Sequence, residues 1–363
     1  MATTKEFFSK EDLKFLETYL NTYSPTGFEA EGQKVWLDYL KPAIDEYHVD
    51  NYGTVYGVVN PKADFKVVIE AHADEISWYV ANITSDGLLY VRRNGGSDHQ
   101  IAPSMRVWIH TEKGKIPGVF GWPAIHLRKG ATGETPAKVE NIFVDCGCIS
   151  AEEVKEKGIH PGTIITFQDG FFTLNDRYFG GRALDNRMGG FMIAKVARLI
   201  KEGKHKLPFG LYIVNSVQEE VGLHGAYMVA HTINPNCAII TDVSHDTSTP
   251  MIDKNVDGDY KCGKGPVLTI APAVHNKLLG HLRSTATKYN IPFQLDAASR
   301  SSGTDTDAWA YTRGGIPSAL ISLPLRYMHT TVEMVAKEDV ENVIKLMKES
   351  VLSLTPNFNF KYL

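Results

Sequence analysis

The chain has 363 residues, of which 43% are hydrophobic and 22% charged, as is ordinary for a globular protein with one large domain or two modest ones. Its net charge of −4 gives no basic surface that would favour a nucleic-acid partner. The first residues lack the apolar region of a signal peptide, and no apolar run is long enough for a membrane span, so we expect no membrane partner.

The cysteine pattern does not indicate a zinc knuckle. Cys146 and Cys148 are too close together for one, and no second pair follows at zinc-site spacing. Cys237 and Cys262 stand alone. We expect all four to be reduced and mostly buried, as in a cytoplasmic protein.

The N-terminal part of the chain predicts two helices and then two strands. Ser9-Lys10-Glu11-Asp12 resembles a capping box with Asp in place of the usual Glu, and apolar residues at helical spacing follow it. The turn Ser24-Pro25-Thr26-Gly27 ends this helix, and a second helix contains residues 35–40. Strand-like runs follow at Val55–Val59 and Lys66–Glu70.

Residues 76–172 have a different pattern. Short runs rich in β-branched and aromatic residues alternate with Gly and Pro turns, and the only helix we expect is Ala151–Lys157. The runs are Leu88–Val91, Met105–His110, Ile116–Phe120 and Thr163–Phe167. They predict a small β-rich domain, a barrel or a sandwich, inserted into an α/β domain formed by residues 1–75 and 173–363.

Helices and strands alternate again after Gly180. The expected strands are Phe209–Val217, Cys237–Thr241, Val267–Ile270, Phe293–Leu295 and Ser318–Leu323. Helical patterns separate most of them, and an amphipathic helix over 337–352 closes the chain. This alternation predicts a mixed, mostly parallel sheet covered by helices on both faces.

Histidines and acids follow several of the expected core strands. They are His72 and Asp74 after the strand at 66–70, Glu219 and Glu220 after 209–217, Asp242 after 237–241, and His329 after 318–323. A further acid, Asp185, enters the first helix after the inserted module. Because ligands of open α/β sheets bind at the carboxyl ends of the strands, we expect these side chains to lie together.

Each of these residues alone is weak evidence for a site. A lone His after a strand is more often a hydrogen-bonded loop residue, Asp185 could be a helix N-cap, and Asp242 could start a turn. The adjacent Glu219 and Glu220 could form a solvated turn. Their coincidence in five segments favours a functional site, which His245 could also line.

Two histidines and three carboxylates suit zinc, cobalt or manganese. Five ligands are too many for one open tetrahedral site, and they suit two ions that share a carboxylate. A carboxylate that is not a ligand must carry the proton of the attacking water to the leaving amine. Glu219 and Glu220 offer one ligand and one proton carrier, and Asp74 would orient the ring of His72.

At these residues the sequence resembles the di-metal aminopeptidases of the tetrahedral-shell (TET) type, a family with glutamyl, leucyl and deblocking members. The matching stretches run in the family's order and span nearly the whole chain. They are Ala71–Glu75, Gly181–Arg187, Val217–Leu223, Thr241–Val243, Gly263–Pro266 and Arg326–Thr330, together with the turn Ser24–Gly27.

The resemblance implies a zinc-exopeptidase-like fold and an aminopeptidase that acts on peptide substrates with two zinc or cobalt ions. Asp185 would bridge the ions, His72 and Asp242 would complete one site, and Glu220 and His329 the other. Glu219 would be the general base. The inserted module would be a dimerisation domain, and dimers would build a homo-oligomer, a hollow dodecamer.

Two stretches depart from the family pattern and leave the specificity open. Ser302–Ala308 carries two extra residues before the Ala, and Ser244–Cys262 is longer and more polar than usual. A related di-metal deacylase or carboxypeptidase could use the same ligands. A glycosidase needs two carboxyls about 5–9.5 Å apart that flank the bond, which adjacent residues cannot easily provide. The complete set of ligands and a base argues against an inactive binding scaffold.

Overall fold

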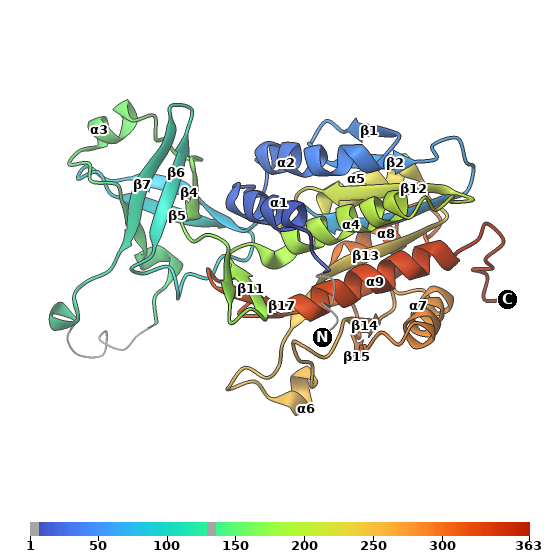
Figure 1. Cartoon of the computed structure of the whole chain (residues 1–363). Helices are drawn as coiled ribbons and strands as arrows, with labels where there is room; N and C mark the ends of the chain where they lie inside the picture. Colours follow the sequence, from blue (N-terminus) through green and yellow to red (C-terminus); the bar gives the residue numbers. More distant parts are fainter. Residues whose placement is uncertain (1–6, 129–135) are drawn as a thin grey trace.

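The structure is a computed structural model that describes residues 7–128 and 136–363. A large unit of helices packed on a sheet carries a smaller β-barrel at one end (Figure 1). Each unit has its own hydrophobic core. The predicted mixed α/β fold interrupted by a small barrel is confirmed.

The large sheet has eleven strands. Nine form a continuous path in the order β1 (Glu46–Val49), β2 (Val55–Val59), β12 (Gly210–Ser216), β3 (Lys66–His72), β13 (Cys237–His245), β16 (Ser318–Arg326), β17 (Glu333–Ala336), β11 (Tyr178–Gly181) and β10 (Phe172–Leu174). The other two, β14 (Val267–Ile270) and β15 (Gln294–Ala297), pair with each other, and β14 also pairs with β16.

Parallel pairing is concentrated at the centre of this sheet. The strands β12, β3, β13 and β16 are parallel to one another, and β14 is parallel to β15. The other six of the ten pairings are antiparallel, so the sheet is mixed, with its parallel strands in the middle. The central strands are buried along almost their whole length because helices cover both faces.

Helices form a layer on each face of the sheet (Figure 1). One layer contains α1 (Lys10–Asn21), α2 (Ala30–Leu40), α4 (Leu184–Glu202), α9 (Lys337–Ser353) and, packed on α9, α7 (Asn276–Lys288). The other contains α5 (His224–Ile233) and α8 (Asp305–Ala310). The predicted capping box of α1 is present, since Ser9 Oγ accepts from the Asp12 N–H at 3.2 Å and Asp12 Oδ2 accepts from the Ser9 N–H at 2.8 Å.

The barrel is closed by six antiparallel strands. They follow the order β4 (Ser77–Ile83), β5 (Leu89–Asn94), β8 (Phe143–Asp145), β7 (Gly114–Gly121), β6 (Arg106–Thr111) and β9 (Ile164–Phe167). Trp78, Phe120 and Phe167 pack against one another inside it. Closure leaves no free strand edge along the barrel wall.

The remaining elements are short. The barrel segment carries α3 (Ala151–Glu156), η2 (Ile125–Leu127) and η4 (Val139–Asn141), while the large unit carries η1 (Lys41–Ala43) and α6 (Lys254–Asp257). Within the residues described, no helix combines the length and the apolar character needed to cross a membrane.

Candidate metal centre and active site

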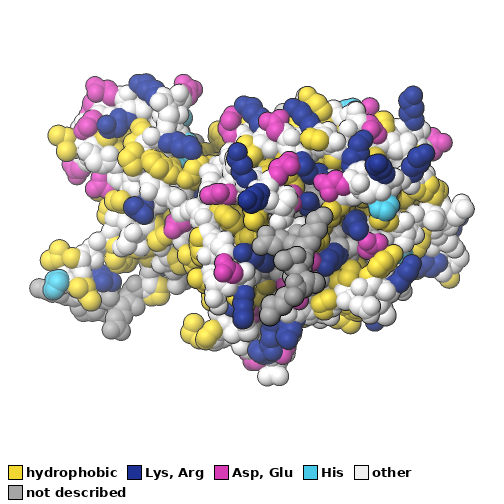
Figure 2. Space-filling view, in the orientation of Figure 1, with side chains coloured by type: hydrophobic (Ala, Val, Ile, Leu, Met, Phe, Trp, Pro, Cys, Tyr) yellow, Lys and Arg dark blue, Asp and Glu magenta, His cyan; other side chains and the backbone are white. Residues whose placement is uncertain are grey.

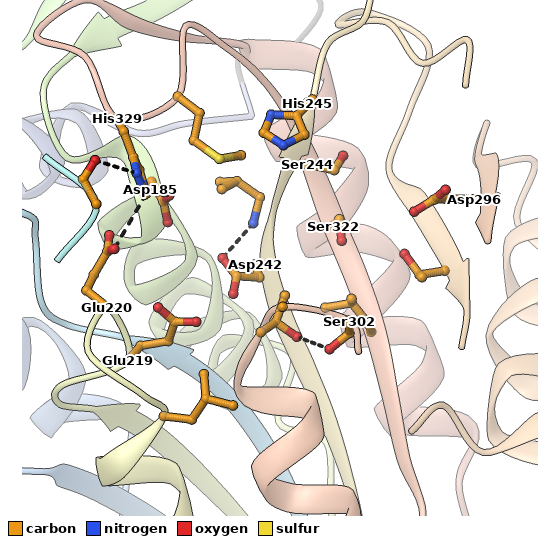
Figure 3. Close-up of a pocket in the computed structure, with 18 residues that line it drawn as sticks. Asp185, Glu219, Glu220, Asp242, Ser244, His245, Asp296, Ser302, Ser322 and His329 are labelled. Carbon is orange, nitrogen blue, oxygen red and sulfur yellow. Dashed lines mark hydrogen bonds and ion pairs between the residues drawn. The ribbon is translucent and has the colours of Figure 1, made fainter. Parts of the chain in front are cut away.

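The predicted ligands meet at the carboxyl ends of the central parallel strands. His72 is the last residue of β3, Asp242 lies in β13, and the loop after β12 carries Glu219 and Glu220. Asp185 lies in the first turn of α4 and His329 in the loop between β16 and β17, and Figure 3 shows both beside Glu220. The structure therefore brings all the sequence-predicted ligands to one place.

Asp185 lies between the two histidines. Its Oδ1 is 3.2 Å from Nε2 of His72, and its Oδ2 is 3.3 Å from Nε2 of His329. Each histidine also faces a second acid: Asp242 Oδ1 is 3.8 Å from His72 Nε2, and Glu220 Oε2 is 3.5 Å from His329 Nε2. One carboxylate thus has a different imidazole against each of its oxygens.

Two overlapping groups of side chains have ligand atoms within 4.8 Å of one another. One contains His72, Asp185 and Glu220, and the other contains His72, Glu219 and Asp242. Glu219 approaches His72 less closely than Asp185 does, with 3.9 Å between Oε2 and Nε2. Ligand atoms this close together could hold a divalent ion.

The backbone at Asp185 explains how an acid in a helix points into the site. Its φ of −78° and ψ of 111° are not helical, so the chain turns here before the regular part of α4. The Asp185 N–H, which has no partner within a helix at this position, donates to Oε2 of Glu333 at 3.1 Å.

Asp74 joins the ring of His72 to the loop that carries the two glutamates. Its Oδ1 is 3.2 Å from His72 Nδ1 and accepts the N–H of Glu219 at 3.0 Å. Its Oδ2 accepts the N–H of Glu220 at 3.2 Å and the hydroxyl of Thr26 at 2.9 Å. Asp74 therefore contacts three candidate site residues, the ring of His72 and the backbone of Glu219 and Glu220.

His329 is oriented by the barrel segment. Its Nδ1 is 3.2 Å from the carbonyl oxygen of Gly96, which follows β5, so Nδ1 carries the proton and Nε2 faces Asp185 and Glu220. A Cβ at position 96 would overlap the His329 ring. The position needs glycine because backbone and imidazole approach so closely.

Glu333 supports the site and was missed in the sequence. Its side chain is buried in β17, where Oε1 accepts the N–H of His329 at 2.8 Å and Oε2 accepts the N–H of Asp185. A carboxylate within the otherwise apolar run of residues 332–336 was the available signal. The short strand β17 itself was also not predicted.

Two further buried acids lie behind His72 and were likewise missed. Ser216 Oγ is 2.5 Å from Oε1 of Glu70 and 2.6 Å from Oδ2 of Asp305. Burial raises the pKa of both carboxyls, and the Asp305 charge raises the pKa of Glu70 further, well above its usual value. Asp305 belongs to the stretch Ser302–Ala308 that departs from the family pattern, and it lies at the start of α8.

The clustered acids of the centre would be stabilised in their ionised form by a positive charge. Burial raises the pKa of Glu219, Glu220 and Asp242, the last to about 8, and neighbouring acids raise each further. Burial lowers the pKa of His72 and His329, but the carboxylates outweigh it and raise the pKa of His329 to about 9. If all four acids ionised, they would hold more negative charge than the two imidazoles can balance, and a bound cation would offset that excess.

The acids Asp185, Glu219, Glu220 and Asp242 line one side of an open pocket of about 590 Å³. Figure 3 shows the hydroxyls of Ser244, Ser302 and Ser322 and the carboxylate of Asp296 on its other side. His245 also lines the pocket, as the sequence suggested. The pocket is large enough for the first residues of a peptide.

A helix-covered mixed sheet, with histidines and acids gathered beside a pocket at the ends of its central strands, defines the class of metal-dependent peptidases built on an α/β fold. Comparison with known proteins identifies the family. The model of the M42 glutamyl aminopeptidase family matches residues 53–346, and the chain belongs to that family.

Individual relatives support this assignment. The chain is 34% identical to the lysyl aminopeptidase of Pyrococcus furiosus over 95% of this chain and 98% of that protein. The structure is similar to that of a TET aminopeptidase from a marine sediment archaeon of the Thaumarchaeota, with a TM-score of 0.90, 29% identity and coverage of 95% and 96% of the two chains. The Pyrococcus horikoshii TET1 peptidase, described as assembling into a tetrahedron or a large octahedral shell, gives a TM-score of 0.82 with 26% identity and coverage of 94% and 100%.

The predicted resemblance to the TET aminopeptidases is therefore confirmed. The protein is a peptide-bond hydrolase, an aminopeptidase of the M42 family, whose members are metal-dependent.

Proposed function

We propose that this aminopeptidase binds two divalent ions, zinc or cobalt with manganese as a further option, and uses Glu219 as its general base. The observation that carries this proposal is the position of Asp185, whose two carboxylate oxygens each face a different histidine. A carboxylate placed in this way can bridge two ions.

The ligand sets follow from the nearest neighbours of each histidine. His72 and Asp242 would complete one metal site with Asp185 Oδ1. His329 and Glu220 would complete the other with Asp185 Oδ2. The donor set of imidazole nitrogens and carboxylate oxygens fits zinc, cobalt and manganese.

When bound, the ions would polarise the scissile carbonyl and lower the pKa of the attacking water. Glu219 would accept the proton of that water at a carboxylate oxygen and pass it to the nitrogen of the leaving amine. Its assignment as base rests on the resemblance to the TET family, because its distance of 3.9 Å from His72 Nε2 hardly differs from the 3.8 Å of the proposed ligand Asp242. Asp74 and Glu333 would hold the ligands in position.

The test is a panel of Leu-, Glu-, Lys- and Ala-anilides, each with a free and an acetylated N-terminus, measured with zinc, cobalt and manganese. Hydrolysis that needs metal and a free N-terminus is the expected result. Loss of the acetyl group from the blocked anilides alone would instead support the deacylase alternative. Release of the C-terminal residue from an acetylated dipeptide with a free carboxyl, assayed beside them, would support the carboxypeptidase alternative. A glycosidase is disfavoured because Glu219 and Glu220 are neighbours and both face the same cluster of histidines.

We also propose that the barrel is the dimerisation domain and that dimers build a dodecamer. The proposal is supported by the tetrahedral assembly of the P. horikoshii relative. Figure 2 shows hydrophobic side chains on the surface of the barrel. Among the described residues of the barrel segment, the apolar side chains of Ile125, Leu127 and Ile149 are the most exposed, at 68%, 75% and 86%, and an interface would cover them.

A cytoplasmic location completes the proposal. All four cysteines are free, and Cys148, Cys237 and Cys262 are buried. Reduced cysteines are the rule in the cytoplasm.

A further inference from the structure

The pocket beside the candidate metal centre has a second wall that no part of the proposed chemistry uses. This wall is built from neighbouring strands β13, β16, β14 and β15, which contribute Ser244, Ser322, Thr269 and Asp296. Apart from Asp296, these side chains are short and uncharged. Asp296 is the one acid of the pocket lining that lies outside the metal cluster.

The register of the sheet places Asp296 well beyond the metal ligands. Asp242 of β13 lies beside Ser322 of β16, β16 pairs with β14, and Thr269 of β14 lies beside Asp296 of β15. Three steps between strands of about 4.8 Å separate the strand of Asp242 from that of Asp296 by roughly 14 Å. Figure 3 shows Asp296 across the pocket from Glu220 and His329.

Within the described part of the chain, one oxygen of the Asp296 carboxylate accepts hydrogen bonds and the other accepts none. Oδ1 accepts the hydroxyl of Tyr260 at 2.5 Å and the N–H of Ala297 at 2.6 Å. Over residues 7–128 and 136–363, no hydrogen bond or ion pair engages Oδ2, and no Lys or Arg lines the pocket. A half-buried carboxylate without a cationic partner is a binding group for a cation.

The long polar segment Ser244–Cys262 holds the Asp296 carboxylate in place through the hydroxyl of Tyr260. Tyr260 belongs to that segment, and burial together with the Asp296 charge raises the pKa of its hydroxyl to about 12, so Tyr260 stays a donor. The segment is anchored next to Tyr260: the N–H of Lys261 donates to Gln294 of β15 at 3.0 Å, and the N–H of Cys262 donates to Asp246 at 3.0 Å. The departure from the family pattern at Ser244–Cys262 therefore builds part of the substrate pocket.

We propose that Asp296 is the specificity residue of this aminopeptidase and binds the ammonium or guanidinium group of an N-terminal lysine or arginine. The inference rests on the proposed function, because it requires the scissile bond to lie at the metal cluster. A lysine side chain extends roughly 6 Å from its Cα, and the Asp side chain with one hydrogen bond covers about another 5 Å. Together they cover about 11 Å of the roughly 14 Å between the two strands, and the Asp242 side chain and the substrate's own Cα–carbonyl bond cover the rest. An N-terminal Glu would meet like charge, and Ala would leave the carboxylate unpaired.

The test compares lysine with norleucine, which has a side chain of similar length without the charge. We measure kcat/KM for Lys-, Arg-, norleucine- and Glu-anilides with the metal-loaded full chain and its Asp296→Asn variant. The wild type should prefer Lys over norleucine by about 10- to 100-fold, the range of a charged hydrogen bond. Asp296→Asn should reduce this ratio to within about threefold of one, and Asp296→Lys should raise the Glu rate relative to the Lys rate.

The ratio is taken within each variant, so losses of folded protein or of metal cancel. Asp259→Asn is the matched control, because Asp259 is an exposed acid of the same segment that pairs with Lys254 and Lys261 and does not line the pocket. Asp259→Asn should keep the wild-type ratio of kcat/KM between the Lys- and norleucine-anilides. An equal loss on Lys and norleucine in Asp296→Asn, or no preference for Lys in the wild type, would overturn the assignment of Asp296 while leaving the aminopeptidase function intact. Failure to cleave any anilide with any metal would overturn both.

Discussion

Asp74 is fully buried beside His72, with its Oδ1 3.2 Å from Nδ1 of that histidine. The same carboxylate accepts the N–H groups of Glu219 and Glu220. A single buried acid therefore lies against the ring of a candidate ligand and holds the loop that supplies the proposed base.

Replacing Asp74 with Asn should weaken metal binding by about 10- to 100-fold, because the amide cannot accept all these hydrogen bonds and no longer supports the His72 ring with a charge. Metal affinity is measured by competition with a chelator. Thr26→Val is the matched control, since it removes only the hydroxyl that donates to Asp74, and it should change the affinity much less. Equal affinities in wild type and Asp74→Asn would show that Asp74 has no orienting role.

Replacing Glu219 with Gln should leave about two metal ions per chain and lower kcat by about 10²- to 10⁴-fold, the usual contribution of a general base. Metal content is measured by elemental analysis of the same sample that is assayed. Normal turnover would rule out Glu219 as the base. Loss of one ion would show that Glu219 is a metal ligand instead.

Replacing Asp185 with Ala should release both ions, because both proposed sites depend on its two oxygens. Glu220→Gln and Asp242→Asn serve as comparisons, and each should weaken one ion more than the other. If Asp185→Ala retained two tightly bound ions, the bridge would be ruled out.

The metal-free protein should lose thermal stability as the pH rises from about 6 to 9. Buried Asp242 and Glu333 keep their protons up to a pKa of about 8, whereas in the unfolded chain they release them near 4, so the folded state binds more protons in between and stability falls with rising pH. His329 acts in the same direction, because its pKa of about 9 in the fold exceeds the 6.5 of the unfolded chain. Asp185 has a lowered pKa and affects stability only in acid.

The measurement is Tm against pH with a chelator and with zinc. Bound metal keeps the ligands in their metal-binding forms, so the stabilisation by zinc should increase with pH. A metal-free Tm that is constant or rises over this range would contradict the charge balance described for the site.

Replacing Ile125 and Leu127 together with Asp should reduce the particle size, because both are exposed apolar residues of the barrel surface. Sedimentation velocity gives the size. Val256→Asp, an exposed apolar residue outside the barrel at 79% exposure, is the control. Unchanged particles in the double variant would exclude this surface from the interface.

The sequence predicted most of the fold and the set of residues at the site, for reasons that are local. Apolar runs such as Lys66–Glu70 read as buried strands, and the acids and histidines that follow them had to lie at one edge of a parallel sheet. Which residues touch depends on distant pairing that the sequence does not display. Glu333 reaches Asp185 only because β17 pairs with both β16 and β11, and Asp296 reaches the pocket only through the pairing of β15 with β14.

The contact between Gly96 and His329 makes the barrel segment part of the candidate metal centre. Excising the barrel to study the peptidase half alone would remove the acceptor that fixes the His329 tautomer. In a chimera with the barrel of a relative, the loop after β5 would have to come from the same protein as the peptidase half, because Gly96 of that loop contacts His329. If the barrel moved when the proposed particle assembled, the carbonyl of Gly96 would move with it, which would couple assembly to His329 of the candidate metal centre.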